Sequence, residues 1–326
     1  MKRREFITLV GGAAAAWPLA AHAQQPAPVI GYLGATSRDK DSRALDALRH
    51  GLKDTGFVEG QNVVIEYRWA EGRYDRLPAL ASDLVRHGVA VIFAPASTPA
   101  ALAAKAAATM TPIVFTVGSD PVAVGLVASL ARPGGNVTGV SRLVNLLSGK
   151  RLELLTALLP NAKKIVILMN PQSTNAWPDL QETETAARAL GLQFVVLNAS
   201  SEREIDAAFA SLPQHQGAAL FVIADGFFRN QQQQIIEQAA RNSMPASYPW
   251  PEFADAGGLM SYGGDDAGSL YLGGVYVGRI LKGEKPANLP VVLSTKLELV
   301  LNLKTAKTLG IEVPPTLLAR ADRVVE

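Results

Sequence analysis

Short apolar runs alternate with amphipathic stretches from Pro28 onward, and this alternation predicts strands and helices in turn. In the first part of the chain, the strand-like runs are 29–33, 63–67, 89–94, 113–116 and 137–140. Apolar residues at helical spacing lie between them, over 41–55, 77–85, 100–110 and 122–130.

The alternation restarts after the turn 132–136, which marks a boundary. Helical spacing continues in 146–159, 180–190, 202–212 and 231–242, and strand-like runs in 165–169, 194–197, 218–223 and 246–248. A tail adds a strand at 259–261, a helix at 270–281 and an apolar run at 297–303. Repeated strand–helix units predict a parallel sheet with helices on both faces. Two series therefore predict two α/β lobes, with a tail that crosses back between them.

The first 23 residues have the three parts of an export signal. Lys2-Arg3-Arg4 forms a basic head, an apolar stretch covers 8–19, and Ala21-His22-Ala23 offers a cleavage point. The paired arginines followed by Phe6 resemble a twin-arginine (Tat) signal. The apolar stretch is shorter than the roughly 20 residues that span a bilayer. We therefore expect 1–23 to be a signal peptide cleaved near Ala23 rather than a membrane anchor, and the mature protein to be periplasmic.

Removing this segment changes the charge balance. It holds three of the 31 basic and one of the 29 acidic residues, so the remaining chain carries 28 of each. A nucleic-acid-binding protein normally has a basic excess, so no nucleic-acid partner is expected. Hydrophobic residues make up 48% of the chain and charged residues 18%, which suits folded lobes rather than a disordered chain.

The sequence offers little for catalysis. The absence of cysteine excludes thiol catalysis, disulfides, a lipoprotein anchor and cysteine metal sites. Three histidines, His50, His87 and His215, remain beyond the signal, and they are not spaced as metal ligands. No nucleophile elbow or phosphate-binding loop occurs, and Asp265-Asp266 is better explained as a helix cap than as a metal pair. We expect no catalytic residue, no metal and no cofactor.

Candidate ligand contacts follow from the ends of the predicted strands, because ligands of open parallel sheets bind beyond the carboxyl ends of the strands. The run 89–94 leads into Ser97-Thr98-Pro99, and 113–116 leads into Ser119-Asp120-Pro121. Thr98 and Asp120 each precede a proline, as a capping residue precedes the first helical turn. Capping explains the pattern, but a helix start with hydroxyl donors also attracts a carboxylate or phosphate. For Ser97 and Thr98 both interpretations stay open.

Aromatic residues form a second candidate group. Tyr248-Pro249-Trp250-Pro251 holds two large rings in a proline-bracketed loop after a strand end, and Tyr262 precedes two glycines. These rings form either a wall for a ligand or a packed surface loop, and the sequence does not separate the two.

Several stretches together resemble one family. The most specific are the proline- and glycine-rich block 129–139 and Asn302-Leu303-Lys304-Thr305-Ala306, and the others are 119–122, 125–127 and 278–286. They are similar to the solute-binding proteins of ABC importers, in the group that includes tryptophan- and tyrosine-binding members. The similarity runs from about Pro28 to Pro315.

The resemblance implies an α/β, two-lobed type I periplasmic-binding-protein fold, in which each lobe is a parallel sheet flanked by helices and three hinge crossovers join the lobes. It divides the chain into a first lobe, 28–141 plus about 262–290, and a second lobe, 142–261 plus about 291–326. By position it implies ligand contacts at Ser97, Thr98, Ser119, Asp120, Asn170, Ser173, Asn175 and Asp225, and near Tyr248 and Tyr262. Trp250, from the aromatic loop, completes the candidate set.

We therefore predict a periplasmic solute-binding protein of an ABC importer. It would capture a small organic ligand, carboxylated or aromatic, between its lobes and deliver it to an ABC permease and ATPase complex in the inner membrane. A periplasmic ligand sensor for a membrane signalling protein is an alternative with the same fold. An exported enzyme is less favoured, because no activated nucleophile, acid–base pair or metal site is visible.

Overall fold

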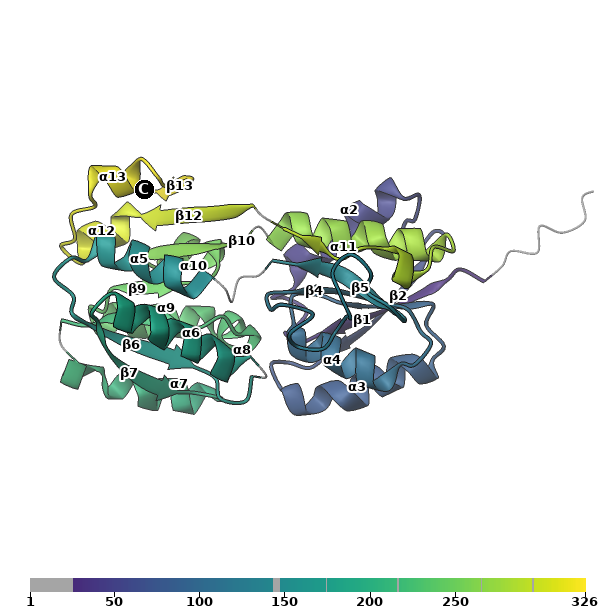
Figure 1. Ribbon diagram of the computed structural model, residues 1–326, viewed down its shortest axis with the longest axis horizontal. Helices are drawn as coiled ribbons and strands as arrows, with labels where there is room; N and C mark the ends of the chain where they lie inside the picture. The colour runs from purple at the N-terminus through teal and green to yellow at the C-terminus, as the bar shows by residue number, and fades with distance from the viewer. Residues whose placement is uncertain (1–25, 143–146, 174, 216, 265, 295) are drawn as a thin grey trace, which may run out of the picture.

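A computed structural model of the chain describes residues 26–142, 147–173, 175–215, 217–264, 266–294 and 296–326. It places them in two α/β lobes that lie end to end (Figure 1). The two lobes and their layers of sheet and helix agree with the architecture expected from the alternating pattern. The predicted signal peptide, 1–23, lies outside the described residues.

The first lobe is built on a six-stranded parallel sheet in the order β11-β5-β4-β3-β1-β2. Its strands are β1 (Val29–Gly34), β2 (Val64–Trp69), β3 (Val91–Ala94), β4 (Ile113–Val117), β5 (Val137–Ser141) and β11 (Val292–Leu293). Its helices are α2 (Ser42–Asp54), α3 (Leu77–Arg86), α4 (Thr98–Ala107) and α11 (Asp266–Leu281), with the short 3-10 turns η1 (Tyr74–Arg76) and η4 (Pro286–Asn288).

The second lobe holds a seven-stranded sheet in the order β13-β12-β10-β9-β8-β6-β7. Its strands are β6 (Lys164–Met169), β7 (Gln193–Asn198), β8 (Ala219–Val222), β9 (Ala246–Tyr248), β10 (Met260–Gly264), β12 (Leu297–Asn302) and β13 (Arg323–Val325), and only the β10–β12 pair is antiparallel. Its helices are α5 (Ser148–Leu158), α6 (Ala176–Ala189), α7 (Glu202–Ala210), η3 (Leu212–His215), α8 (Gly226–Asn230), α9 (Gln232–Arg241), α10 (Pro251–Asp255), α12 (Leu303–Thr308) and α13 (Pro315–Leu318).

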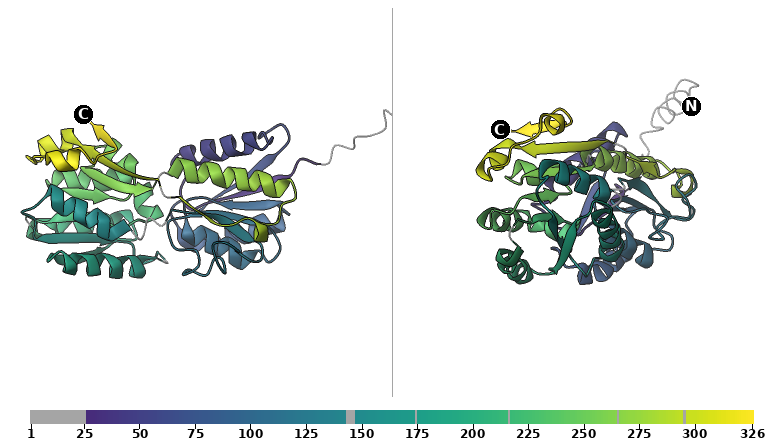
Figure 2. Two further views of the ribbon diagram at one scale, coloured as in Figure 1. Left: turned by 45° about the horizontal axis from the view of Figure 1, so that its top comes forward. Right: turned by 60° about the vertical axis from the view of Figure 1, so that its left-hand side comes forward.

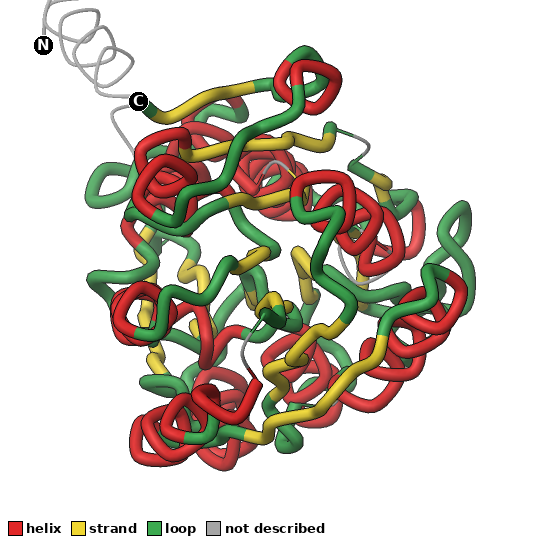
Figure 3. The backbone as a smooth tube through the Cα atoms, turned by 90° about the vertical axis from the view of Figure 1, so that its left-hand side faces the viewer, coloured by secondary structure: helices red, strands yellow, loops and turns green. Residues whose placement is uncertain are grey.

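Helices cover both faces of each sheet, as the view along the long axis shows (Figure 3). Each lobe therefore holds two apolar clusters, one on each face of its sheet. In β1, Leu33 belongs to the cluster with α3 and α4, and Tyr32 to the cluster with α2 and α11. This alternation explains why the central strands are apolar at nearly every position. Within the described residues, no helix is long and apolar enough to cross a membrane.

The chain passes between the two sheets three times. It leaves the first sheet after β5, returns between β10 and α11, and leaves again between β11 and β12. The division expected from the sequence put 262–290 with the first lobe. The structure pairs β10 in the second sheet as far as Gly264, and β11 in the first sheet as far as Leu293.

Helix α11 is the part of the tail that packs into the first lobe. It lies alongside α2 in the first lobe, although about 200 residues separate the two helices (Figure 2). Glycines permit this close approach, because a Cβ atom on Gly51 of α2 would lie 2.2 Å from the carbonyl oxygen of Tyr271. A Cβ atom on Gly274 of α11 would lie 2.5 Å from the carbonyl oxygen of Leu48.

The predicted helix at 122–130 is wrong, since the chain forms turns and bends there. Asp120 Oδ1 accepts hydrogen bonds from the backbone nitrogens of Val122 (2.8 Å) and Ala123 (3.2 Å), so a capping interaction is present. Gly125 then adopts a φ of 72°, which ends any right-handed helix. Leu126 and Val127 are buried as part of a loop, and this burial explains the misleading apolar spacing.

Candidate functional site

A small cavity of about 40 Å³ lies between the lobes, where the carboxyl ends of both parallel sheets meet. Its walls come from the segments after β2, β3, β4 and β5 of the first lobe and after β6, β8 and β9 of the second. The lining residues are Tyr74, Ala96, Ser97, Thr98, Pro99, Gly118, Arg142, Ser173, Asn175, Ala224, Asp225, Gly226 and Trp250. Six residues predicted from the sequence are among them.

The start of α4 forms one wall of the cavity. Ser97, rather than the predicted Thr98, caps this helix, because its Oγ accepts a hydrogen bond from Ala100 N (3.2 Å). Thr98 is already the first helical residue, so its hydroxyl is available for other contacts. The preceding Ala96 has a φ of 49°, a left-handed conformation that costs an alanine about 1–2 kcal/mol. A hydrogen bond from Ala96 N to Thr116 Oγ1 (2.7 Å) holds it there.

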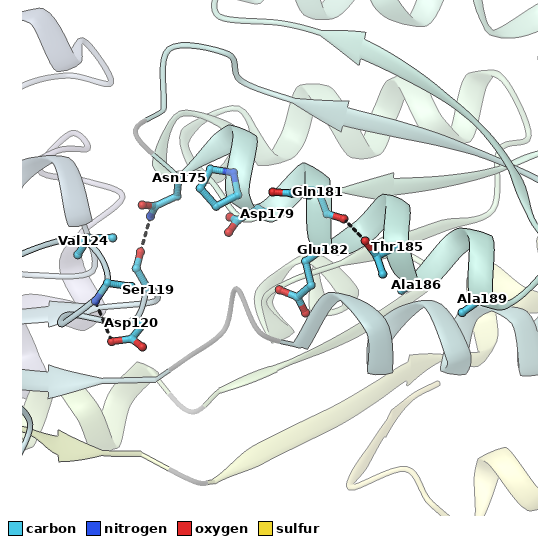
Figure 4. A pocket seen from close by; sticks show the side chains of 12 residues that line it. Ser119, Asp120, Val124, Asn175, Asp179, Gln181, Glu182, Thr185, Ala186 and Ala189 are labelled. Carbon is cyan, nitrogen blue, oxygen red and sulfur yellow. Dashed lines mark hydrogen bonds between the residues drawn. The ribbon is translucent and has the colours of Figure 1, made fainter.

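A chain of polar side chains crosses from the first lobe to the second beside this helix start. Thr98 Oγ1 lies 2.8 Å from Ser119 Oγ, and Asn175 Nδ2 of the second lobe donates a hydrogen bond to the same Ser119 Oγ. Figure 4 shows Ser119 and Asn175 joined across the gap. The structure therefore brings three predicted contacts into one network.

Asp225 is the centre of a second network between the lobes. Tyr74 of the first lobe donates its hydroxyl hydrogen to Asp225 Oδ2 (2.8 Å). Asp225 Oδ1 accepts hydrogen bonds from Asn170 Nδ2 (3.1 Å) and from Phe227 N (2.9 Å), and Ser173 donates a further one to the carboxylate. Asn170 thus supports Asp225 from behind the cavity wall instead of lining the cavity.

Burial dominates the acid–base behaviour of this network. Removal from water raises the pKa of Asp225 above its ordinary value, while its hydrogen bonds to Asn170, Tyr74 and Ser173 act in the opposite direction. Burial, followed by the nearby charge of Asp225, raises the pKa of Tyr74 well above its ordinary value. Tyr74 is therefore a hydrogen-bond donor at physiological pH, and not a phenolate.

The sequence interpretation missed the two other polar side chains of this cavity, those of Arg142 and Tyr74. Arg142 is 4% exposed and belongs to the lining. It stands directly after β5, so reading the end of 137–140 like the other strand ends would have found it. Tyr74 lies in the short turn η1, and no local pattern indicated that it would reach Asp225, 151 residues further along the chain.

The three predicted aromatic residues have different surroundings. Trp250 lines the cavity and is 5% exposed. Tyr248 lies outside the cavity, in the core of the second lobe, where its ring stacks on Phe253 with the ring centroids 4.7 Å apart. Tyr262 packs against the other core cluster of that lobe. In the parallel pairing of β9 with β10, Ser261 is the partner of Tyr248, so the next residue, Tyr262, faces the opposite side of the sheet from Tyr248.

A larger groove of about 700 Å³ lies beside the cavity (Figure 4). The loop Ser119–Val124 of the first lobe and helix α6 of the second lobe form its sides, and Asp120 belongs to this groove. Of the residues that the structure describes, Asn175 alone lines both spaces. Charged and polar groups from both lobes converge on the small cavity, which makes it the candidate ligand site. Among the described residues, no group of acidic or histidine side chains is arranged to hold a metal ion.

Comparison with known proteins identifies relatives that cover most of the chain. The model of the family described as ABC transporter substrate binding protein matches residues 30–325. A tyrosine-binding protein of Clostridioides difficile (strain R20291) is 29% identical over 273 residues, which are 82% of this chain and 78% of the relative.

Two solved structures are also similar over 91% of this chain and 99% of theirs. A conserved domain protein of Vibrio cholerae has a TM-score of 0.84 at 28% identity, and an ABC domain from Streptococcus pneumoniae in complex with L-tryptophan has 0.82 at 27% identity. These matches confirm the two-lobed binding-protein fold.

A third structure has the same sequence identity as the tryptophan complex but a lower structural similarity. The ligand-free, open structure of a substrate-binding protein from Clostridium difficile is also 27% identical and covers 92% of this chain and 99% of its own, but its TM-score is only 0.64. Since the identities are equal, the lower score points to a different placement of the lobes. The arrangement here is nearer to that of the tryptophan complex.

Proposed function

Because the chain belongs to the family of ABC transporter substrate-binding proteins, we propose that it captures a small carboxylated ligand in the cavity between its two lobes. The family and its solved relatives are solute-binding proteins and not enzymes. The tyrosine- and tryptophan-binding relatives support a ligand of amino-acid size.

The observation that carries this proposal is the grouping of hydrogen-bond donors at the start of α4. This helix has ten residues, and its positive dipole end points its first N–H groups toward the cavity lining at Ser97 and Thr98. Arg142, a cationic residue, lines the same cavity. Donors of both kinds bind a carboxylate with charge-assisted hydrogen bonds.

Among the described residues, two side-chain pairs join the lobes in and beside the cavity, Tyr74 with Asp225 and Ser119 with Asn175, and Phe227 N also donates to Tyr74 Oη. A ligand of amino-acid size needs more room than about 40 Å³. We infer that these contacts break and re-form as the lobes rotate about the three crossings, which is a hinge motion. The lower similarity to the open relative supports this motion.

Substrate-binding proteins of ABC transporters typically act outside the cytoplasm, together with a membrane permease and ATPase. We propose that this chain is exported by the twin-arginine route, loses 1–23, and delivers its ligand in the periplasm to such a complex. The basic head, the short apolar stretch and Ala21-His22-Ala23 support this route. Loss of ligand uptake in a strain without the protein supports transport, whereas intact uptake with a lost ligand response would favour the sensor alternative.

Replacing Thr98 with alanine tests the site. A hydrogen bond to a charged group is worth about 1.5–3 kcal/mol, and 1.4 kcal/mol corresponds to a factor of ten in affinity. Thr98→Ala is therefore expected to weaken binding of a carboxylate ligand about tenfold or more in calorimetric titration.

Thr183→Ala is the matched control. Thr183 is also a buried helical threonine, but its hydroxyl donates to Asp179 O (2.7 Å) in α6 and it does not line the cavity. This variant is expected to lose stability while keeping the wild-type affinity. Equal affinity of Thr98→Ala and the wild type would remove the helix start from the binding site.

A further inference from the structure

The carboxylate of the cavity, that of Asp225, already accepts hydrogen bonds from the protein. A carboxylate has about four acceptor positions, and four donors use those of Asp225: Tyr74 Oη, Asn170 Nδ2, Phe227 N and a hydrogen bond from Ser173. An ammonium group could bind this carboxylate only by displacing one of them.

Donor groups are in surplus at the edge of the cavity, where Thr98 lines it and Ser119 lies in the neighbouring groove. Ser119 Oγ accepts a hydrogen bond from Asn175, and Ser119 Oγ and Thr98 Oγ1 form one hydrogen bond with each other. Only one of these two hydroxyls donates in that bond, so the other hydroxyl can donate its hydrogen to a ligand. Neither hydroxyl has another partner among the described residues. Trp250 also lines the cavity. Its indole N–H is buried and forms no hydrogen bond with any described residue. Arg142 adds a positive charge to this lining.

The first lobe supplies the group that occupies Asp225. Tyr74 Oη lies 3.1 Å from the position that a Cβ atom would take on Gly226, so a larger residue there would press against the phenol. The same Oη accepts a hydrogen bond from Phe227 N (3.2 Å) at the start of α8. Tyr74 is therefore built into the cavity wall whenever the lobes adopt this arrangement.

We propose that this cavity selects a carboxylate ligand without an α-ammonium group, and that Tyr74 determines this selectivity by occupying Asp225. The inference rests on the proposed function, since it assumes a carboxylate in this cavity. It separates the chain from relatives described as tyrosine-binding or complexed with L-tryptophan.

Pairs of compounds that differ only in the amino group test this proposal on the mature protein. The pairs are L-tryptophan with 3-(indol-3-yl)propanoate, L-tyrosine with 3-(4-hydroxyphenyl)propanoate, and L-leucine with 4-methylpentanoate. Thermal shift identifies the pairs that bind, and calorimetry gives their affinities. The deaminated member is expected to bind more tightly than the amino acid, by about tenfold or more, because a buried ammonium could reach Asp225 only by displacing one of its donors.

Tyr74→Phe frees one oxygen of Asp225 and is expected to reduce this preference about tenfold. Tyr271→Phe is the matched control, because its hydroxyl also donates to a carboxylate at 2.8 Å, that of Asp54, away from the cavity. A purely structural role of Tyr74 would weaken both members of a pair equally and leave their ratio unchanged.

The outcomes separate the two proposals. Tighter binding of the amino acid overturns the selectivity but leaves a carboxylate-binding protein. An unchanged ratio in Tyr74→Phe overturns the role of Tyr74. Absence of binding by every member of the three pairs counts against the proposed function itself, and the selectivity falls with it.

Discussion

Placing a methyl group on Gly51 should separate α2 from α11 and destabilise the first lobe. In Gly51→Ala, the new Cβ atom would lie 2.2 Å from Tyr271 O, 2.7 Å from Val275 N and 2.9 Å from the carbonyl carbon of Gly274. All three are backbone atoms of α11, so no side-chain rotation relieves the contact. The helices must move apart by about 1 Å to restore ordinary van der Waals distances.

The magnitude follows from two opposing terms. Overpacking of a close-packed interior costs about 1–3 kcal/mol, and the rigid neighbours here place the cost near the upper end. Alanine favours a helix over glycine by about 1 kcal/mol. The net loss is therefore about 2 kcal/mol, or about 4–8 °C in melting temperature for a chain of this size.

Thermal and urea unfolding of the mature protein measure this loss, with Gly149→Ala as the matched control. A Cβ atom on Gly149 of α5 would meet only the Cβ atom of Ala186, at 3.6 Å, which is an ordinary contact. This control should be as stable as the wild type or up to about 1 kcal/mol more stable. Equal stability of Gly51→Ala and Gly149→Ala would refute the close-packing argument.

Three further predictions concern closure, pH and export. In small-angle scattering, the protein saturated with a tight ligand should keep a small radius of gyration. Asn175→Ala without ligand should have a larger one, because a contact between the lobes is lost. Identical radii of the two samples would contradict this. Burial raises the pKa of Asp41 above its ordinary value near 3.9. Wild-type stability relative to Asp41→Asn should therefore rise as the pH falls toward 4, and a difference that does not vary with pH in urea unfolding would contradict this. Replacing Arg3 and Arg4 by lysines should reduce export and accumulate the uncleaved chain; unchanged export would indicate the general secretory route.

Much of the secondary structure could be predicted from local sequence. Strands β3 and β4 are buried at every residue, and their apolar runs were visible as 89–94 and 113–116. Helix α2 buries Leu45, Leu48 and Leu52, which have the spacing of one helix face. These patterns are local because the helix or strand period alone decides which residues of an element share its buried face.

Local patterns failed where a single interaction decided the backbone. The stretch 122–130 has helical apolar spacing, but the turn capped by Asp120 and the left-handed Gly125 exclude a helix. At α4, the proline after Thr98 indicated Thr98 as the cap, and only the structure, with its extended backbone at Ser97, shows that Ser97 accepts the bond.

The candidate site divides in the same way. Ser97 and Thr98 follow a strand end, so the rule for parallel sheets placed them near one edge, and the family resemblance added Ser173, Asn175 and Asp225 by position. Tyr74 and Asp225, by contrast, are 151 residues apart and belong to different lobes. Their contact depends on how the lobes are placed by the three crossings. The sequence by itself determined which residues stand at the sheet ends, because that depends on periods of a few residues. Only the tertiary structure decided which of them meet, because a hydrogen bond requires atoms from both lobes within about 3 Å.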